Sequence, residues 1–382
     1  MIRRLPRTAV LVLAFAVLAA LTSLLAPAAR AGAAPDTLAD STWVDRWTLR
    51  NGLEVTVRHI PRCSGVAVVT AYRVGRNQDP RGREGLADLA SEVVFTGAAG
   101  DVPERTRDQL NGLRPLGWNV QVTPRFTLFS EVATLTQLPG VLRQAATRMR
   151  GVSVTDSILA RSLRAVVREQ SERYVGSPER TLFNQLREIA LGVGDEDLIR
   201  RVAGRTLRDL TAREVADRLR RLYVPANAVV ALAGNLDGVE LRTLVGKLFG
   251  DIPGGTALTE PPPPRLTGGG RTIRRPALDH AVAGVAILAP AITDTLHPNF
   301  YLNAQVIGRY CADTWGSPQP PLSIRFRYPV FADADFVQFF PPVASGETDA
   351  DQAGIAMQDA IEKLAITVMP MKSFDDVRQN NQ

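Results

Sequence analysis

The sequence has 382 residues, of which 45% are hydrophobic and 22% charged; this composition fits a globular protein and excludes fibrous and disordered classes. The length is enough for two domains, and two cysteines are too few for a disulfide scaffold. The net charge is +6, but four arginines lie in residues 1–31, and without them the charge is +2. No arginine cluster is interleaved with aromatic residues, so we expect no nucleic-acid partner.

Residues 1–31 have the pattern of a secretory signal peptide. A basic start is followed by an uncharged apolar run over residues 8–25 and a small-residue site at 29–31. We therefore predict export, to the periplasm or the extracellular space. An uncleaved membrane anchor is the alternative, because the apolar run is almost long enough to span a bilayer. Beyond the membrane, Cys63 and Cys311 could pair, or both could remain unpaired buried thiols.

Residues 254–270 divide the chain. They read GGTALTEPPPPRLTGGG, in which the prolines impose extended backbone and the glycines loosen both ends. We predict that this linker separates a first domain, residues 42–253, from a shorter second domain, residues 271–382.

The predicted elements of the first domain come in clusters of strands and clusters of helices. Strands are expected in two stretches within 47–59 around an Asn-Gly turn, and at 65–74, 118–121, 126–134 and 228–233. Helices are expected at 84–95, just after residue 106, at 157–189 and at 211–222. Clustering without strict alternation predicts an α+β fold, with a mixed or antiparallel sheet covered by helices.

Several short motifs follow one another along this domain. They are Asn51-Gly52-Leu53, Val74-Gly75, Gly85-Leu86-Ala87, Phe95-Thr96-Gly97, residues 116–119 (LGWN), 166–169 (VVRE), 223–227 (YVPAN), 233–235 (AGN) and 248–253 (LFGDIP). In this order and spacing they resemble the pitrilysin/insulinase family of zinc metallopeptidases, the inverzincins. The resemblance implies two consecutive αβ domains that together form half of a chamber.

The catalytic motif of that family is not preserved. The family carries His-x-x-Glu-His on one helix, and the three key positions correspond here to Asp88, Ser91 and Glu92. A serine at the general-base position, Ser91, cannot take a proton from water at neutral pH. The three histidines of the chain lie elsewhere in the sequence, at His59, His280 and His297. We therefore expect a degenerate zinc site, no catalytic residue and no peptidase activity.

Three carboxylates nevertheless occupy the metal-ligand positions. Asp88 and Glu92 project from one face of a helix because they lie one turn apart, and the resemblance places Glu169 at the third ligand position. Such a trio could bind a hard divalent cation: calcium, magnesium or manganese. The favoured alternative is a solvated acidic face without a cofactor. Its partners would be arginines such as Arg81, Arg83 and Arg168.

The second domain resembles the family less closely. We expect strands at 281–289 and 336–340, a helix at 297–308 and an amphipathic helix at 348–368. Prolines within 315–321 exclude the arginine-rich helix that the family has there. Tyr328 falls at the family position for a tyrosine that contacts substrate backbone, whereas Pro321 replaces its arginine partner, for which Arg325 or Arg327 could compensate.

These observations predict an exported, catalytically silent insulinase-like protein. It would act as a silent subunit or as a peptide-binding scaffold. Its partner would be an active paralogue or a second copy of the same chain. Extended polypeptide would bind by strand addition near Asn119, with Tyr328 as a second contact. The alternatives are a divergent metal-dependent endopeptidase that uses the three carboxylates, and a structural component of an envelope complex.

Overall fold

The computed structural model describes residues 42–123, 125–175 and 205–259, and shorter stretches at 284–288, 290, 294–304, 325–326, 336–339, 352, 355 and 359. The chain divides into two compact units. The first comprises residues 1–168 and 203–261, and the second comprises 169–202 and 262–382. Each unit is described by itself. The predicted signal segment and most of the predicted linker lie outside the described residues, and the predicted domain boundaries stay predictions.

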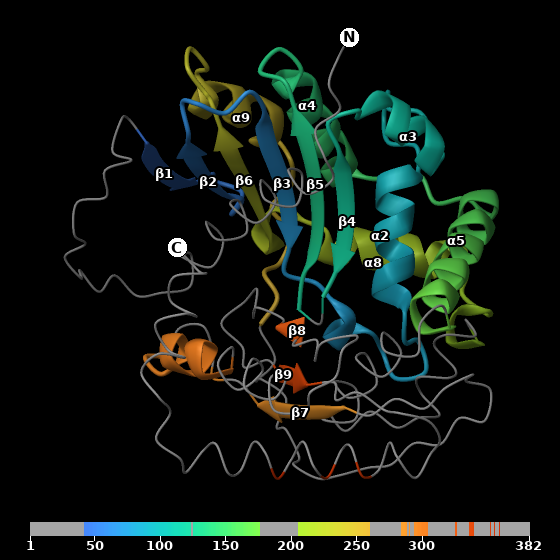
Figure 1. Cartoon of the computed structure of the whole chain (residues 1–382). Helices are drawn as coiled ribbons and strands as arrows, with labels where there is room; N and C mark the ends of the chain where they lie inside the picture. The colour runs from blue at the N-terminus through green and yellow to red at the C-terminus, as the bar shows by residue number, and fades with distance from the viewer. Residues whose placement is uncertain are drawn as a thin grey trace. The chain divides into compact units, whose positions relative to one another are not determined.

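The first unit is built on a six-stranded sheet (Figure 1). Along the chain the strands are β1 (Trp43–Thr48), β2 (Glu54–His59), β3 (Val66–Tyr72), β4 (Trp118–Val122), β5 (Thr127–Ala133) and β6 (Ala228–Gly234). In space their order is β1-β2-β6-β3-β5-β4. Only the β2–β6 pair is parallel, so the sheet is mixed and the predicted α+β class is confirmed. β1 and β4 form the two edges.

The Asn-Gly signal in the first predicted strand pair corresponds to a real turn. Gly52 has φ = 86°, a left-handed backbone conformation that costs glycine little, and Leu49 donates a hydrogen bond across the turn to Leu53 O. The Asn51 side-chain amide donates to the carbonyl oxygens of Phe249 and Ile252 at 2.8 and 2.9 Å. The hairpin is therefore tied to a segment about two hundred residues further along the chain.

Six helices of the described residues accompany the sheet. They are α2 (Leu86–Thr96), α3 (Arg107–Leu113), α4 (Leu138–Arg150), α5 (Asp156–Val175), α8 (Ala212–Leu222) and α9 (Leu241–Phe249). Short 3-10 turns occur at η1 (Arg76–Gln78), η2 (Arg205–Leu207) and η3 (Pro225–Asn227). Thr106 and Thr211 cap α3 and α8, each in a reciprocal capping box, which confirms both predicted helix starts. No helix among the described residues is long and apolar enough to cross a membrane.

The core of the first unit lies between the sheet and the helices. Helices α2 and α4 pack against β5, α2 also contacts β4 and α8, and α4 also contacts β3 and α9. Val68 and Tyr72 of β3 and Val230 of β6 face this core, as the two-residue period of a strand requires. β3 and β6 are nevertheless buried at every residue, so both faces of the central sheet are covered.

Less of the second unit is described. Its strands β7 (Val285–Leu288), β8 (Arg325–Phe326) and β9 (Phe336–Phe339) form a sheet in the order β7-β9-β8, with antiparallel pairs. Residues 297–304 are helical, so the predicted helix begins where expected, and β7 and β9 lie within the predicted strands. Residues 352, 355 and 359 are helical and lie within the last predicted helix, and Ile355 is 62% exposed. Tyr328, Pro321 and Cys311 lie outside the described residues, and Cys63 has a free thiol.

Candidate functional site

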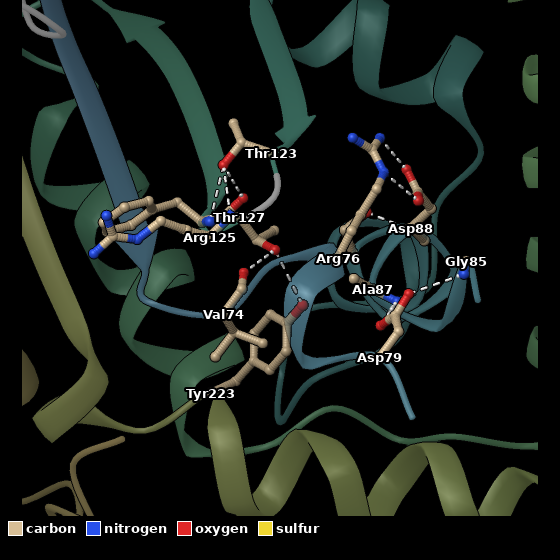
Figure 2. Close-up of polar contacts among 12 residues, drawn as sticks. Val74, Arg76, Asp79, Gly85, Ala87, Asp88, Thr123, Arg125, Thr127 and Tyr223 are labelled. Atoms are coloured by element: carbon tan, nitrogen blue, oxygen red, sulfur yellow. Dashed lines mark hydrogen bonds and ion pairs between the residues drawn. The ribbon is translucent and has the colours of Figure 1, made fainter. Parts of the chain in front are cut away.

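Helix α2 carries the three degenerate positions, and an aspartate from outside the helix fixes its beginning. Gly85 precedes the helix with φ = 96°, in the left-handed region. The Asp79 carboxylate accepts the backbone N–H groups of Gly85 and Ala87, both at 2.9 Å (Figure 2). Those N–H groups have no partner within the helix, and a negative charge also suits the positive end of the helix dipole. Asp79 thus caps α2 although six residues separate it from Gly85.

Asp79 also forms the most deeply buried ion pair of this region. Arg218 of α8 donates from Nη2 to Asp79 Oδ1 at 2.9 Å and from Nη1 to the carbonyl oxygen of Gln78, also at 2.9 Å. The two charged side chains are only 5% and 4% exposed. The pKa of Asp79 is raised to about 7, chiefly by burial and also by neighbouring Asp88, against the opposing effects of Arg218 and the two N–H donors. α8 is thereby joined to the start of α2.

The first degenerate ligand position, Asp88, is engaged by an arginine. Arg76 of η1 donates from Nε to Asp88 Oδ2 at 2.9 Å and from Nη2 to Oδ1 at 2.7 Å, which is the planar two-bond geometry typical of arginine and carboxylate (Figure 2). The Arg76 backbone N–H donates to Thr123 O just beyond β4. Arg76 therefore links α2 to the end of the edge strand.

Ser91 and Glu92, at the other two positions on α2, also form hydrogen bonds within the protein. Arg107, the first residue of α3, donates from Nη2 to Glu92 Oε2 at 2.7 Å and from Nε at 3.2 Å, and the Glu92 side chain is 8% exposed. Ser91 is buried, and its hydroxyl donates to the carbonyl oxygen of Asp88 at 2.8 Å. A hydroxyl used in this way satisfies a backbone acceptor and offers no base for water.

Glu169, the predicted third ligand, lies on α5 and is half-buried. Among the residues that the structure describes, no group of three or more His, Cys, Asp or Glu side chains is placed to hold a metal ion. The carboxylate trio therefore stays a prediction. Zinc fits α2 poorly, because protein zinc sites usually include imidazole or thiolate ligands, whereas this helix offers two carboxylates that are both bound to arginine.

Two arginines that were not among the expected partners pair with α2. Arg76 and Arg107 hold Asp88 and Glu92, whereas Arg83 pairs with Glu214 of α8 at 3.5 Å. The sequence interpretation missed Arg76, Asp79, Arg107 and Arg218 altogether. Arg76 and Arg107 lie only 12 and 15 residues from their partners, so their proximity to α2 was a usable signal. Nothing in the sequence points from Asp79 to Arg218, 139 residues away.

Hydrogen bonds through two hydroxyl groups connect Tyr223, Thr127 and Val74. The Thr127 hydroxyl donates to Val74 O at 2.8 Å, and the Tyr223 hydroxyl donates to Thr127 Oγ1 at 3.4 Å (Figure 2). Burial raises the pKa of Tyr223 to about 12, so its hydroxyl stays protonated at neutral pH. This chain is a fully buried structural contact.

Strand β4 provides an edge next to α2. Asn119, the predicted polypeptide contact, lies on β4 and is exposed. The bond from Val132 N to Gly117 O and the register of β4 with β5 direct the backbone groups of Asn119 towards β5. The N–H and C=O groups of Trp118 and Val120 therefore point outward, and within the described part of the chain they have no hydrogen-bond partner. Tyr328, the other predicted contact, lies outside the described residues.

Known proteins share the fold of this chain, and one family model matches part of its sequence. The family model described as "Peptidase M16 inactive domain" matches residues 209–327. No curated protein is significantly similar in sequence. The peptidase M16 inactive domain from Pseudomonas fluorescens has a TM-score of 0.71 at 13% identity, covering 88% of this chain and 82% of that one.

Two proteases are also similar in structure. A protease from Helicobacter pylori has a TM-score of 0.67 at 16% identity, with 89% of this chain and 84% of that chain covered. The periplasmic protease PqqL from Escherichia coli has a TM-score of 0.63 at 14% identity, and the match covers 88% of this chain but 39% of PqqL. The chain therefore has the fold of these M16 peptidase-like proteins, as the motifs indicated, and residues 209–327 match the peptidase M16 inactive-domain family model.

Proposed function

We propose that the protein is an exported, catalytically silent insulinase-like protein that binds extended polypeptide along strand β4. The single observation that carries this proposal is the edge: Trp118 and Val120 present outward backbone donors and acceptors directly beside α2. A polypeptide in extended conformation would pair with these groups and add a seventh strand to the sheet. Exposed Asn119 would contact side chains of the added strand.

The chemistry of α2 supports binding without cleavage. A peptidase of this fold needs a general base and a metal, whereas Ser91 bonds to a backbone carbonyl and both α2 carboxylates bind arginines. Export is supported by the signal-like pattern of residues 1–31 and by the description of PqqL as periplasmic. The partner would be an active paralogue, with a homo-oligomer as the alternative.

Strand addition can be tested by removing one backbone donor. Proline at an outward-facing edge position removes an N–H group without breaking the ladder to the neighbouring strand, so Val120→Pro should leave the β4–β5 pairing intact. The probe is a fluorescein-labelled 14-residue peptide of alternating valine, threonine and lysine, followed by anisotropy. We expect Val120→Pro to weaken binding about tenfold or more, because a backbone hydrogen bond and close approach are lost.

The matched control is Val120→Ala, which shortens the same side chain but keeps the N–H group. It should bind the peptide within about twofold of the parent chain, and circular dichroism should show that both variants are folded. Equal binding by the proline variant and the parent chain would disprove strand addition at β4. Binding lost equally in both variants would assign the effect to the side chain instead.

The absence of peptidase activity is tested by incubating the purified chain with the same peptide, with and without EDTA. We expect no chelator-sensitive cleavage. Turnover that EDTA abolishes and Glu92→Gln removes would instead establish the divergent metal-dependent endopeptidase.

Co-purification from the native envelope tests the partner: an associated paralogue with an intact His-x-x-Glu-His motif supports the silent subunit. A complex without peptide binding supports a structural component.

A further inference from the structure

We propose that Arg76 and Arg107 are internal cations that take the place of the family's metal ion, so that this site binds no divalent cation. The inference is independent of polypeptide binding at β4. It rests on the two ion pairs that occupy the ligand face of α2, between Asp88 and Arg76 and between Glu92 and Arg107.

Asp88 and Glu92 carry like charges close together on α2. Side chains one helical turn apart have Cβ atoms about 6 Å from each other, so ionised Asp88 and Glu92 repel one another on α2. Their side chains are 13% and 8% exposed, and water therefore screens little of this repulsion. A fold that keeps both carboxylates at these positions needs two positive charges nearby. One metal dication or two arginines would supply them.

The carboxylate oxygens of Asp88 and Glu92 are already in contact with arginines. Arg76 bonds to both carboxylate oxygens of Asp88, at 2.9 and 2.7 Å. Arg107 bonds to Glu92 Oε2 with two nitrogens, at 2.7 and 3.2 Å, and its Nε lies 3.4 Å from Oε1. All four carboxylate oxygens of this face are thus in contact with guanidinium groups. Calcium requires six to eight oxygen ligands, and to reach these four it would have to displace both arginines.

Backbone hydrogen bonds hold the segments that carry the two arginines. The backbone N–H of Arg76 bonds to Thr123 O, and that of Arg105 bonds to Thr96 O at the last residue of α2. Both segments that deliver the guanidinium groups are therefore anchored to the elements around the site. A divalent cation would have to separate Arg76, whose side chain is 20% exposed, from its carboxylate, which leaves a largely buried positive charge without its partner.

The direct test uses the full chain. It is dialysed separately against zinc, calcium and manganese chloride at 1 mM, and the bound metal is measured by mass spectrometry, with thermal melts with and without each ion. We expect less than about 0.1 equivalent of metal per chain and melting shifts below about 1 °C. About one equivalent that is lost in Glu92→Gln would overturn the proposal.

A gain-of-function variant provides the second test. Arg76→Gln/Arg107→Gln releases both carboxylates, and we expect it to acquire calcium binding with a melting rise of about 3 °C or more, which added Glu92→Gln abolishes. A folded double variant that binds none of the three cations would show that the arginines are not what excludes them. If the double variant does not fold, Arg107→Gln alone is used, because Arg107 is the more exposed arginine at 40%.

Discussion

The beginning of α2 and its middle are both held by arginine–carboxylate pairs, yet water reaches the two regions to different extents. At the beginning, Asp79 and Arg218 are 4% and 5% exposed and also bond to backbone groups. In the middle, Arg107 is 40% exposed above the buried carboxylate of Glu92. The comparison teaches that the start of α2 is part of the structural core. In the middle, the carboxylate is buried as well, but its arginine partner is partly exposed to water.

Removing the cation at the beginning of α2 should have the largest effect. Arg218→Leu leaves the Asp79 carboxylate buried without its partner, and we expect about 3 kcal/mol of lost stability at pH 8. Urea unfolding followed by tryptophan fluorescence measures it. At pH 5.5 the loss should shrink, because Asp79 can then take up a proton; an equal loss at both pH values would contradict the buried pair.

The pH dependence of stability should report the same carboxyl group. The folded-state pKa of Asp79 is raised to about 7, above its unfolded value near 3.8, so the folded state binds the proton more tightly. Its contribution to stability is complete below the unfolded pKa and is lost as the pH rises through 7. Between pH 8 and 5.5 we expect a gain of about 2 kcal/mol.

Asp79→Asn separates this contribution from other titrating groups. The N–H groups of Gly85 and Ala87 bond to different carboxylate oxygens of Asp79, so asparagine keeps an acceptor for one of them, and it has no proton to exchange between these pH values. The slope of stability between pH 8 and 5.5 should therefore flatten in this variant, by urea unfolding at each pH. An unchanged slope would assign the dependence to another group.

A smaller effect is expected in the middle of α2. Arg107→Gln replaces a charged donor with a neutral one beside Glu92, and we expect about 1 kcal/mol of destabilisation because the arginine is partly solvated. Added salt should reduce the difference between variant and parent, since the pair reaches water. A loss as large as that of Arg218→Leu would show that the two regions do not differ as their exposure indicates.

The smallest effect is expected on the outer surface of α8. Arg220 pairs with Asp217 within one helical turn, and their side chains are 71% and 45% exposed. Arg220→Gln should change stability by less than about 0.5 kcal/mol, because exposed pairs contribute little. Since Arg220 lies two residues from Arg218 on the same helix, this variant is the matched control for the first prediction.

The sequence by itself determined the local elements and the fold class. The Asn51-Gly52 turn, the Thr106 and Thr211 caps and the strands β3, β5 and β6 follow from backbone preferences and residue periodicity, which act over a few neighbouring residues. The sequence also contains Asp88, Ser91 and Glu92 at the positions where the resemblance places the family's catalytic motif.

Only the tertiary structure decided which charges meet. Arg76, from a turn, pairs with Asp88, and Arg107, from the start of another helix, pairs with Glu92, whereas Arg218 contacts Asp79 across 139 residues. The edge position of β4 likewise depends on the order of strands in space. Local preferences cannot specify such contacts, because chain closure and packing bring distant segments together only in the folded molecule.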